Sequence, residues 1–318
     1  MTDATSARAI LVVAHARRDD TVAAARRVIA ALIDAGARPV LAVDDPELVA
    51  ALADLGPLAA LGTEVHVSEI ELAIVLGGDG TILRAAELVR DGTAPILGIN
   101  MGHVGFLAEI EPDVIDQAMR RIIARDYTVE ERMTLSVRVK DAAGAVIYET
   151  WALNEATVEK AARERMMEVV IEIDRRPLSS FGCDGVVIAT PTGSTAYNFS
   201  AGGPVIWPTV EAIAVVPLSA HALFARPLVV GPEATVAIEV LARTDGTGIL
   251  WCDGRRSHDL PPGARVVVLR SAQPVRLARL HPAPFTDRLV RKFQLPVTGW
   301  RGPDEKTSSA PHPGEGLA

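Results

Sequence analysis

Cysteine is scarce in this sequence of 318 residues, and positive charge does not predominate. The two cysteines, Cys183 and Cys252, are far apart and match neither a metal-binding spacing nor a disulfide framework. We therefore expect a reducing compartment, the cytoplasm. At a formal net charge of −8, no basic cluster is dense enough to follow the phosphates of a nucleic acid or a membrane surface, so neither is an expected partner.

Long hydrophobic runs are also missing. Residues 1–8 lack the apolar core of a signal peptide, and proline and charged residues interrupt the most apolar later stretch, Val205–Val230. We predict no membrane-spanning segment. The 49% of hydrophobic residues nevertheless suffices for more than one hydrophobic core.

The common nucleotide-binding signatures are absent as well. The sequence contains no Gly-x-x-x-x-Gly-Lys-Ser/Thr loop and no Gly-x-Gly-x-x-Gly dinucleotide fingerprint. The His-Arg-Asp and Asp-Phe-Gly signatures of protein kinases are missing too. These absences exclude the standard nucleotide-binding loops.

Hydrophobic patterning divides the remaining chain into two parts. In the first part, short apolar runs alternate with segments of helical period, which predicts a Rossmann-like α/β domain with a parallel sheet covered on both faces. The expected strands are Ala9–Val13, Pro39–Val43, Leu72–Leu76 and Ile96–Ile99, and the expected helices are Thr21–Ala35, Pro46–Leu55, Ile82–Val89 and Pro112–Arg125.

From about Thr128 the pattern changes to short alternating runs separated by turn residues, which predicts antiparallel strands and a second, β-rich domain. The expected strands include Thr134–Val139, Val146–Trp151, Val169–Ile173, Thr235–Leu241 and Ala264–Leu269. We place the first domain at residues 1–130 and the second at 131–280. Residues 301–318 have little to bury and are expected to be disordered.

A glycine-rich turn, Gly77–Thr81 (GGDGT), lies directly between an expected strand and an expected helix. Ligands bind at such places in open α/β sheets, because free N–H groups and the positive end of the helix dipole point there. Asp79 adds a carboxylate that could hold a hydroxyl proton or a divalent cation. The alternative is a structural turn in which Asp79 caps the helix.

Two further segments are ambiguous by themselves. A second glycine-rich turn, Gly98–Leu107, would lie beside the first, and its His103 lacks an identifiable carboxylate partner for a general base. Asn154 and Glu155 follow an expected strand, where neighbouring side chains point to opposite faces, so a simple turn explains them better.

The densest signal is Asp184–Asn198 (DGVVIATPTGSTAYN), an apolar strand that continues into small hydroxyl residues and an aromatic residue. Hydroxyls and exposed N–H groups can bind phosphate or ribose oxygens, and Tyr197 offers a flat face for a base. A turn rich in serine and threonine is the alternative, and the length of the run argues against it.

In type, order and spacing, four segments closely resemble the NAD kinase family, and the resemblance spans residues 8–295. They are Gly77–Thr81, Asn154–Glu155, Asp184–Tyr197 and Pro217–Val230. Lipid kinases of the diacylglycerol and sphingosine type share the first turn, and Asp184–Tyr197 separates them. A lipid kinase and a non-catalytic NAD(H)-sensing module stay open as alternatives.

The resemblance implies a phosphoryl transfer from ATP or inorganic polyphosphate to the 2′-hydroxyl of the adenosine ribose of NAD, giving NADP, with Mg²⁺ as the expected cation. It implies NAD in the cleft between an α/β domain and a β-rich domain, with residues 281–300 returning to pack on the first domain. A homo-oligomer, either a dimer or a tetramer, is also implied.

For individual residues, the resemblance implies that Asp79 is the general base, although it could instead orient the hydroxyl or bind the metal. The implied NAD-binding residues are Asp79, Gly80, Arg84, Asn154, Glu155, Arg165, Asp184, Thr195, Ala196, Tyr197, Asn198, Phe199 and Ser200. The chain departs from the family pattern at Arg255, where many relatives have glutamine.

Overall fold

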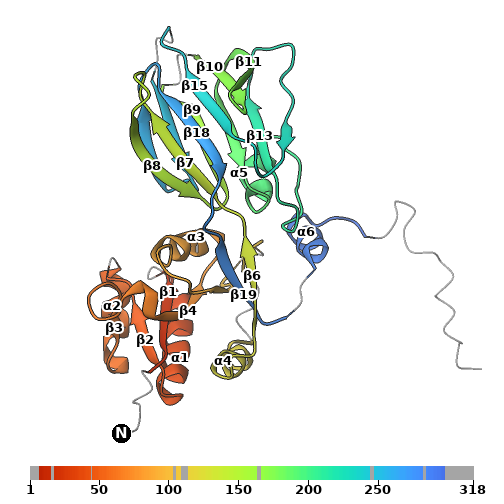
Figure 1. Ribbon diagram of the computed structural model, residues 1–318. Coiled ribbons are helices and arrows are strands. Elements are labelled where there is room, and N and C mark those ends of the chain that lie inside the picture. Colours follow the sequence, from red (N-terminus) through yellow and green to blue (C-terminus); the bar gives the residue numbers. More distant parts are fainter. Residues whose placement is uncertain are drawn as a thin grey trace, which may run out of the picture.

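The computed structural model describes residues 7–15, 18–43, 45–102, 105–108, 114–162, 166–243, 247–281 and 284–297. These residues form one seven-stranded sheet and two six-stranded sheets. The seven-stranded sheet and its helices lie at one end of the molecule, and the two six-stranded sheets lie at the other (Figure 1).

The seven-stranded sheet has the order β3-β2-β1-β4-β5-β19-β6. Its strands are β1 (Ala9–Ala14), β2 (Arg38–Leu41), β3 (Ala59–Ala60), β4 (Ile70–Leu76), β5 (Ile96–Ile99), β6 (Thr128–Arg132) and β19 (Val275–Arg279). Neighbouring strands are parallel from β3 to β19, whereas β6 pairs antiparallel with β19. Every residue of β1 is buried, as expected for a strand covered on both faces.

Helices cover both faces of this sheet. They are α1 (Asp19–Asp34), α2 (Pro46–Leu52), α3 (Asp79–Leu88) and α4 (Ile115–Ile123). Ile10 and Val12 share a core with α1, α2 and α4, whereas Leu11 and Val13 share a second core with α3. Because side chains alternate along a strand, β1 separates two layers of helices. The helices α1, α2 and α4 cover one face of the sheet, and α3 covers the other.

The two six-stranded sheets are antiparallel, with the orders β11-β10-β15-β18-β7-β8 and β14-β13-β12-β9-β16-β17. Their strands are β7 (Leu135–Lys140), β8 (Val146–Ala152), β9 (Glu155–Lys160), β10 (Met167–Ile173), β11 (Arg176–Cys183), β12 (Gly185–Ala189), β13 (Ile213–Leu218), β14 (Leu228–Val230), β15 (Val236–Val240), β16 (Gly248–Cys252), β17 (Arg256–Leu260) and β18 (Arg265–Arg270).

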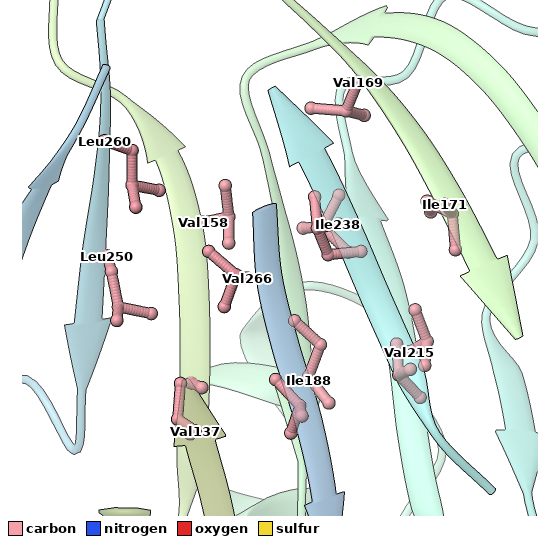
Figure 2. Packing of buried hydrophobic residues seen from close by; sticks show 14 of the residues in the cluster. Val137, Val158, Val169, Ile171, Ile188, Val215, Ile238, Leu250, Leu260 and Val266 are labelled. Carbon is pink, nitrogen blue, oxygen red and sulfur yellow. The ribbon is translucent and has the colours of Figure 1, made fainter. Parts of the chain in front are cut away.

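The two antiparallel sheets share one core. Figure 2 shows Val158 and Ile188 of one sheet together with Ile238 and Val266 of the other, and all four are fully buried. Two short helices complete the fold, α5 (Tyr197–Ser200) and α6 (Phe285–Phe293). In Figure 1, α6 lies between the two ends of the molecule, below α5.

The predicted fold class is confirmed: an α/β part with a largely parallel sheet precedes a β-rich part with antiparallel sheets. One difference concerns the end of the chain. β19 lies in the seven-stranded sheet, although the sequence-based division assigned residues up to 280 to the second domain. A five-residue strand has no pattern that reveals which sheet it joins. The division at residue 130 stays a prediction, and residues 301–318 lie outside the described residues.

The helices formed by the described residues include none with both the length and the apolarity that crossing a bilayer requires.

The shared sandwich core can be tested at Ile188, which is fully buried in β12. We expect Ile188→Ala to lower the free energy of unfolding by about 2–5 kcal/mol, because it removes buried methyl groups and leaves a cavity. Urea unfolding followed by circular dichroism measures the change. Val146→Ala, at an exposed position of β8, is the control and should change stability little. An equal effect of the two substitutions would contradict the packing described here.

Candidate active site

The turn Gly77–Thr81 connects β4 to α3 and ends at an open helix terminus. Gly78 is the N-cap and Asp79 is the first helical residue, so Asp79 does not cap the helix. A Cβ atom at Gly77 would collide with the side chain of Thr81, whereas one at Gly78 or Gly80 would meet nothing within 4 Å. The first turn of α3 therefore faces free space, with the positive end of the helix dipole directed there.

The carboxylate of Asp79 is held by the second glycine-rich turn. Its Oδ2 accepts a hydrogen bond of 3.0 Å from the backbone N–H of Phe106, and its Oδ1 accepts one of 3.0 Å from that of Leu107. A Cβ atom at Gly105 would collide with this carboxylate. The predicted adjacency of the two turns is thus confirmed, while His103 lies outside the described residues.

Aromatic contacts connect this turn to α5. The ring of Phe106 lies 6.0 Å from that of Phe285 and 5.7 Å from that of Phe293, both in α6. Phe293 in turn stacks on Phe199 of α5, with 4.4 Å between the ring centroids. The second glycine-rich turn is therefore connected through α6 to α5, the short helix that begins at Tyr197.

The turn at Asn154 and Glu155 is fixed by a buried carboxylate that sequence reasoning missed. Asp253 accepts hydrogen bonds from the backbone N–H groups of Leu153 (3.0 Å) and Asn154 (2.7 Å). Asp253 and Gly254 both have positive φ, 55° and 64°, in the hairpin between β16 and β17. The sequence feature that could have revealed this hairpin is the Asp253-Gly254 dipeptide, because Asp-Gly is typical of tight turns between strands.

Close packing accounts for several small residues of the Asp184–Asn198 segment. The backbone N–H of Thr190 donates to the carbonyl of Asn154 over 2.9 Å, and a Cβ atom at Gly193 would collide with the Asn154 backbone. The buried hydroxyl of Ser194 donates to the carbonyl of Pro191 over 2.7 Å. This part of the segment thus holds the Asn154 turn in place.

The last residues of the segment and the two that follow it, Phe199 and Ser200, differ in exposure. The side chain of Asn198 is buried, and its amide donates to the carbonyls of Ser194 (3.2 Å) and Pro204 (3.0 Å), so it stabilises the local turn. Thr195 and Ala196 are half-buried. The exposed residues are Tyr197, Phe199 and Ser200.

Glu155 is a buried carboxyl group with an incomplete set of partners. It is 7% exposed, and its Oε2 atom has no hydrogen-bond partner within the described part of the chain. Burial, reinforced by the charge of Asp253, raises the pKa of Glu155 to about 8, although a backbone hydrogen bond from Tyr197 opposes the shift. A polar ligand with a donor group would satisfy this carboxyl.

The pKa values of Tyr197 and Asp184 are shifted in opposite directions. Burial raises the pKa of the Tyr197 phenol, and the negative charges of Glu159, Glu155 and Asp184 raise it further. The pKa of Asp184 is lowered, first by a hydrogen bond from Lys160, whose Nζ lies 2.5 Å from Oδ1, and then by Ser219. Tyr197 lies beside Glu155, to which its backbone N–H donates, whereas Asp184 precedes β12 at the end of the β9/β12 pair that is remote from Glu155.

Arg84, Arg165 and Arg255 are the remaining residues that the sequence analysis singled out. Arg84 lies on α3 and donates to Asp45 over 3.1 Å, while the other oxygen of Asp45 accepts from the N–H of Leu48 at the start of α2. Arg165 lies outside the described residues. Arg255 donates to Glu87 of α3 over 3.0 Å.

A separate cavity of about 740 Å³ lies where α4, β6, β19 and α6 meet. Its lining includes Arg121, Arg132, Arg279 and Arg288 together with the ring of Trp207. Of the predicted site residues that the structure describes, none belongs to this lining.

Comparison with known proteins decides the family. Two family models match, the ATP-NAD kinase N-terminal domain over residues 58–127 and the ATP-NAD kinase C-terminal domain over residues 153–280. The NAD kinase of Leifsonia xyli is 66% identical over 298 residues, which cover 93% of this chain and 98% of that protein. The chain belongs to the NAD kinase family.

Solved structures show the same fold. Yeast NADH kinase complexed with NADH superposes with a TM-score of 0.81 at 21% identity, covering 97% of this chain and 90% of that chain. An NAD kinase from Archaeoglobus fulgidus in complex with ATP gives a TM-score of 0.67 at 24% identity, covering 90% and 98%. The predicted activity, phosphorylation of NAD, is confirmed by the family, and nothing in the comparisons favours a lipid kinase or a sensing module.

Gly105→Ala tests the contact between the two glycine-rich turns of this NAD kinase. The new Cβ atom would displace either the Asp79 carboxylate or the loop, and a displacement of about 1 Å can cost about 100-fold in turnover. We expect that loss in the kcat of NAD phosphorylation. The control is Gly231→Ala, where a Cβ atom meets nothing within 4 Å. Unchanged kcat in Gly105→Ala would contradict the contact.

The pKa of Glu155 predicts a pH dependence of stability. Because its pKa rises from 4.5 to about 8 on folding, the protonated carboxyl stabilises the fold at low pH, and this contribution is lost as the pH rises from about 4.5 to 8. Relative to Glu155→Gln, the unmodified chain should lose on the order of a few kcal/mol of unfolding free energy between pH 5 and pH 8. Urea unfolding at both pH values measures this.

Glu149→Gln, at an exposed position of β8, is the matched control and should leave the pH dependence as it is. If Glu155→Gln leaves it unchanged as well, Glu155 is not the group responsible.

Proposed function

We propose that this NAD kinase transfers the phosphoryl group to the 2′-hydroxyl of the adenosine ribose of NAD, with Asp79 as the general base. The observation that carries the proposal is the fixed carboxylate of Asp79 at the open first turn of α3. Phosphoryl transfer depends on positioning and charge neutralisation more than on covalent catalysis. The fixed carboxylate of Asp79 can position the attacking hydroxyl, and the helix terminus beside it can neutralise part of the phosphate charge.

Asp79 has the capacity for this role. Each of its oxygens accepts one backbone N–H, and a carboxylate oxygen has a second lone pair that can accept a hydroxyl proton. As the hydroxyl attacks phosphorus, its proton passes to Asp79 while the bond to the donor's leaving oxygen breaks. The N–H groups of the α3 terminus are suited to the phosphoryl oxygens.

NAD would bind along the surface from α3 to α5. The exposed ring of Tyr197 is suited to stacking on a base. The Glu155 carboxyl group, whose Oε2 atom has no partner among the described residues, is suited to ribose hydroxyls. Asn154 directly precedes Glu155, and Asp184 is proposed as a further contact. The other proposed contacts are Gly80, Arg84, Arg165, Thr195, Ala196, Asn198, Phe199 and Ser200; of these, Asn198 would act through the turn it holds.

ATP is the proposed phosphoryl donor, with inorganic polyphosphate as the second candidate. Support for ATP comes from the family models, which describe ATP-NAD kinases, and from the A. fulgidus enzyme in complex with ATP. The open helix terminus at Gly78 and Gly80 would accept the terminal phosphates of either donor.

A divalent cation such as Mg²⁺ fits this site. Mg²⁺ usually binds one or two carboxylates together with substrate phosphates and water, and the remaining lone pairs of Asp79 can supply such a ligand. When bound, the cation would neutralise charge on the phosphates.

We also propose a cytoplasmic homo-oligomer, either a dimer or a tetramer. Support comes from exposed apolar side chains in the β-rich part, with Leu223 and Phe224 fully or half exposed and Trp207 45% exposed. Light scattering coupled to size exclusion would give the mass in solution.

Asp79→Asn tests the proposed base. We expect kcat to fall by about 10²–10⁴-fold while NAD still binds, because the amide cannot accept the proton. The assay gives the protein Mg²⁺ and NAD with ATP in one reaction and polyphosphate in another, and an NADP-specific dehydrogenase reads the product. Asp259→Asn, at an exposed position of β17, is the control.

Normal turnover by Asp79→Asn would remove Asp79 from the catalytic role. The reaction in which the unmodified chain forms NADP, with ATP or with polyphosphate, identifies the phosphoryl donor. If neither donor gives NADP although calorimetry shows bound NAD, the proposed transfer is wrong.

A further inference from the structure

The backbone of Phe106 and Leu107 is bonded on both sides. The two N–H groups donate to the carboxylate of Asp79. The two carbonyl groups accept from arginines: Arg288 Nη1 donates to the Phe106 carbonyl over 2.7 Å, and Arg279 Nη1 donates to the Leu107 carbonyl over 2.9 Å. Two consecutive residues thus connect two guanidinium groups to the proposed catalytic carboxylate.

Both arginines come from the end of the chain and are themselves anchored. Arg279 ends β19, is 7% exposed, and donates from Nε to Glu130 of β6 over 2.9 Å. Arg288 lies in α6, whose aromatic residues Phe285 and Phe293 contact the Phe106 ring. The strand and the helix therefore bring two fixed cations to one short loop.

The loop needs such support because it has no regular structure of its own. Residues 105–108 belong to neither a helix nor a strand. The Phe106 carbonyl and the Leu107 N–H belong to one peptide group, so the cation of Arg288 on that carbonyl strengthens the hydrogen bond that Leu107 donates to Asp79. The guanidinium groups also restrain the loop, and through it the orientation of the Asp79 carboxylate.

We propose that Arg279 and Arg288 are positioning residues for phosphoryl transfer, acting on Asp79 through the backbone of Phe106 and Leu107. This inference rests on the proposed role of Asp79. It gives β19 and α6 a function in catalysis: the last segments of the chain hold the loop that holds the carboxylate.

Arg288→Met is the first test, because Arg288 lies on a partly exposed helix that the Phe106 contacts keep docked. We expect kcat for NAD phosphorylation to fall about tenfold, in line with the loss of one charge-assisted hydrogen bond. The KM values for NAD and ATP should stay within about twofold, because the arginine does not touch either substrate in this account. Arg288→Lys should restore part of kcat.

The matched control is Arg291→Met, which removes the same charge from an exposed position one turn further along α6. It should leave kcat unchanged. Arg279→Lys is the second test, since it keeps a buried cation but alters the geometry at Leu107, and it too should lower kcat more than KM. Thermal unfolding of each variant establishes that it is folded.

The inference is overturned if folded Arg288→Met and Arg279→Lys both keep normal kcat, or if only their KM for NAD rises. Asp79→Asn, assayed in parallel, separates this failure from a failure of the proposed function. Loss of turnover in Asp79→Asn with normal kcat in the arginine variants would refute the positioning role alone.

Discussion

The carboxylate of Asp79 accepts two backbone hydrogen bonds from consecutive residues, Phe106 and Leu107, and this contact joins the two glycine-rich turns at the ends of β4 and β5. It needs a glycine at position 105, where any side chain would collide with the carboxylate. It also leaves the first turn of α3 open. A fixed acceptor beside a helix terminus whose free N–H groups can bind phosphate is suited to phosphoryl transfer to a hydroxyl.

The rest of the chain supports this contact and completes the surface beside it. β19 and α6 reach the loop through Arg279 and Arg288, and the aromatic residues of α6 extend the contact to α5. In the β-rich part, the buried carboxylate of Asp253 fixes the backbone before Glu155. Among the described residues the Glu155 Oε2 atom has no hydrogen-bond partner, and burial raises the pKa of this carboxyl group to about 8. Such an incompletely satisfied group is typical of a binding site.

Much of the fold was readable from the sequence, because buried parallel strands are continuous apolar runs and Ile96–Ile99 was predicted residue for residue. The Gly77–Thr81 turn and the helix that follows it were also predicted from local sequence, because the glycines lie directly between an apolar run and a segment of helical period. Contacts between distant segments could not be predicted from the sequence. The strand β19 has too few residues to reveal which sheet it joins. No local pattern indicates the contacts of Asp253 with Asn154 or of Arg288 with Phe106. Those contacts are set by the tertiary fold.

The most direct test of this account is a crystal structure of the protein with NAD bound. We expect the 2′-hydroxyl of the adenosine ribose to lie within hydrogen-bond distance of an Asp79 carboxylate oxygen, about 2.6–3.2 Å. The N–H groups of Phe106 and Leu107 should still donate to that carboxylate. An adenosine ribose bound away from Asp79, with its 2′-hydroxyl facing another acceptor, would contradict it.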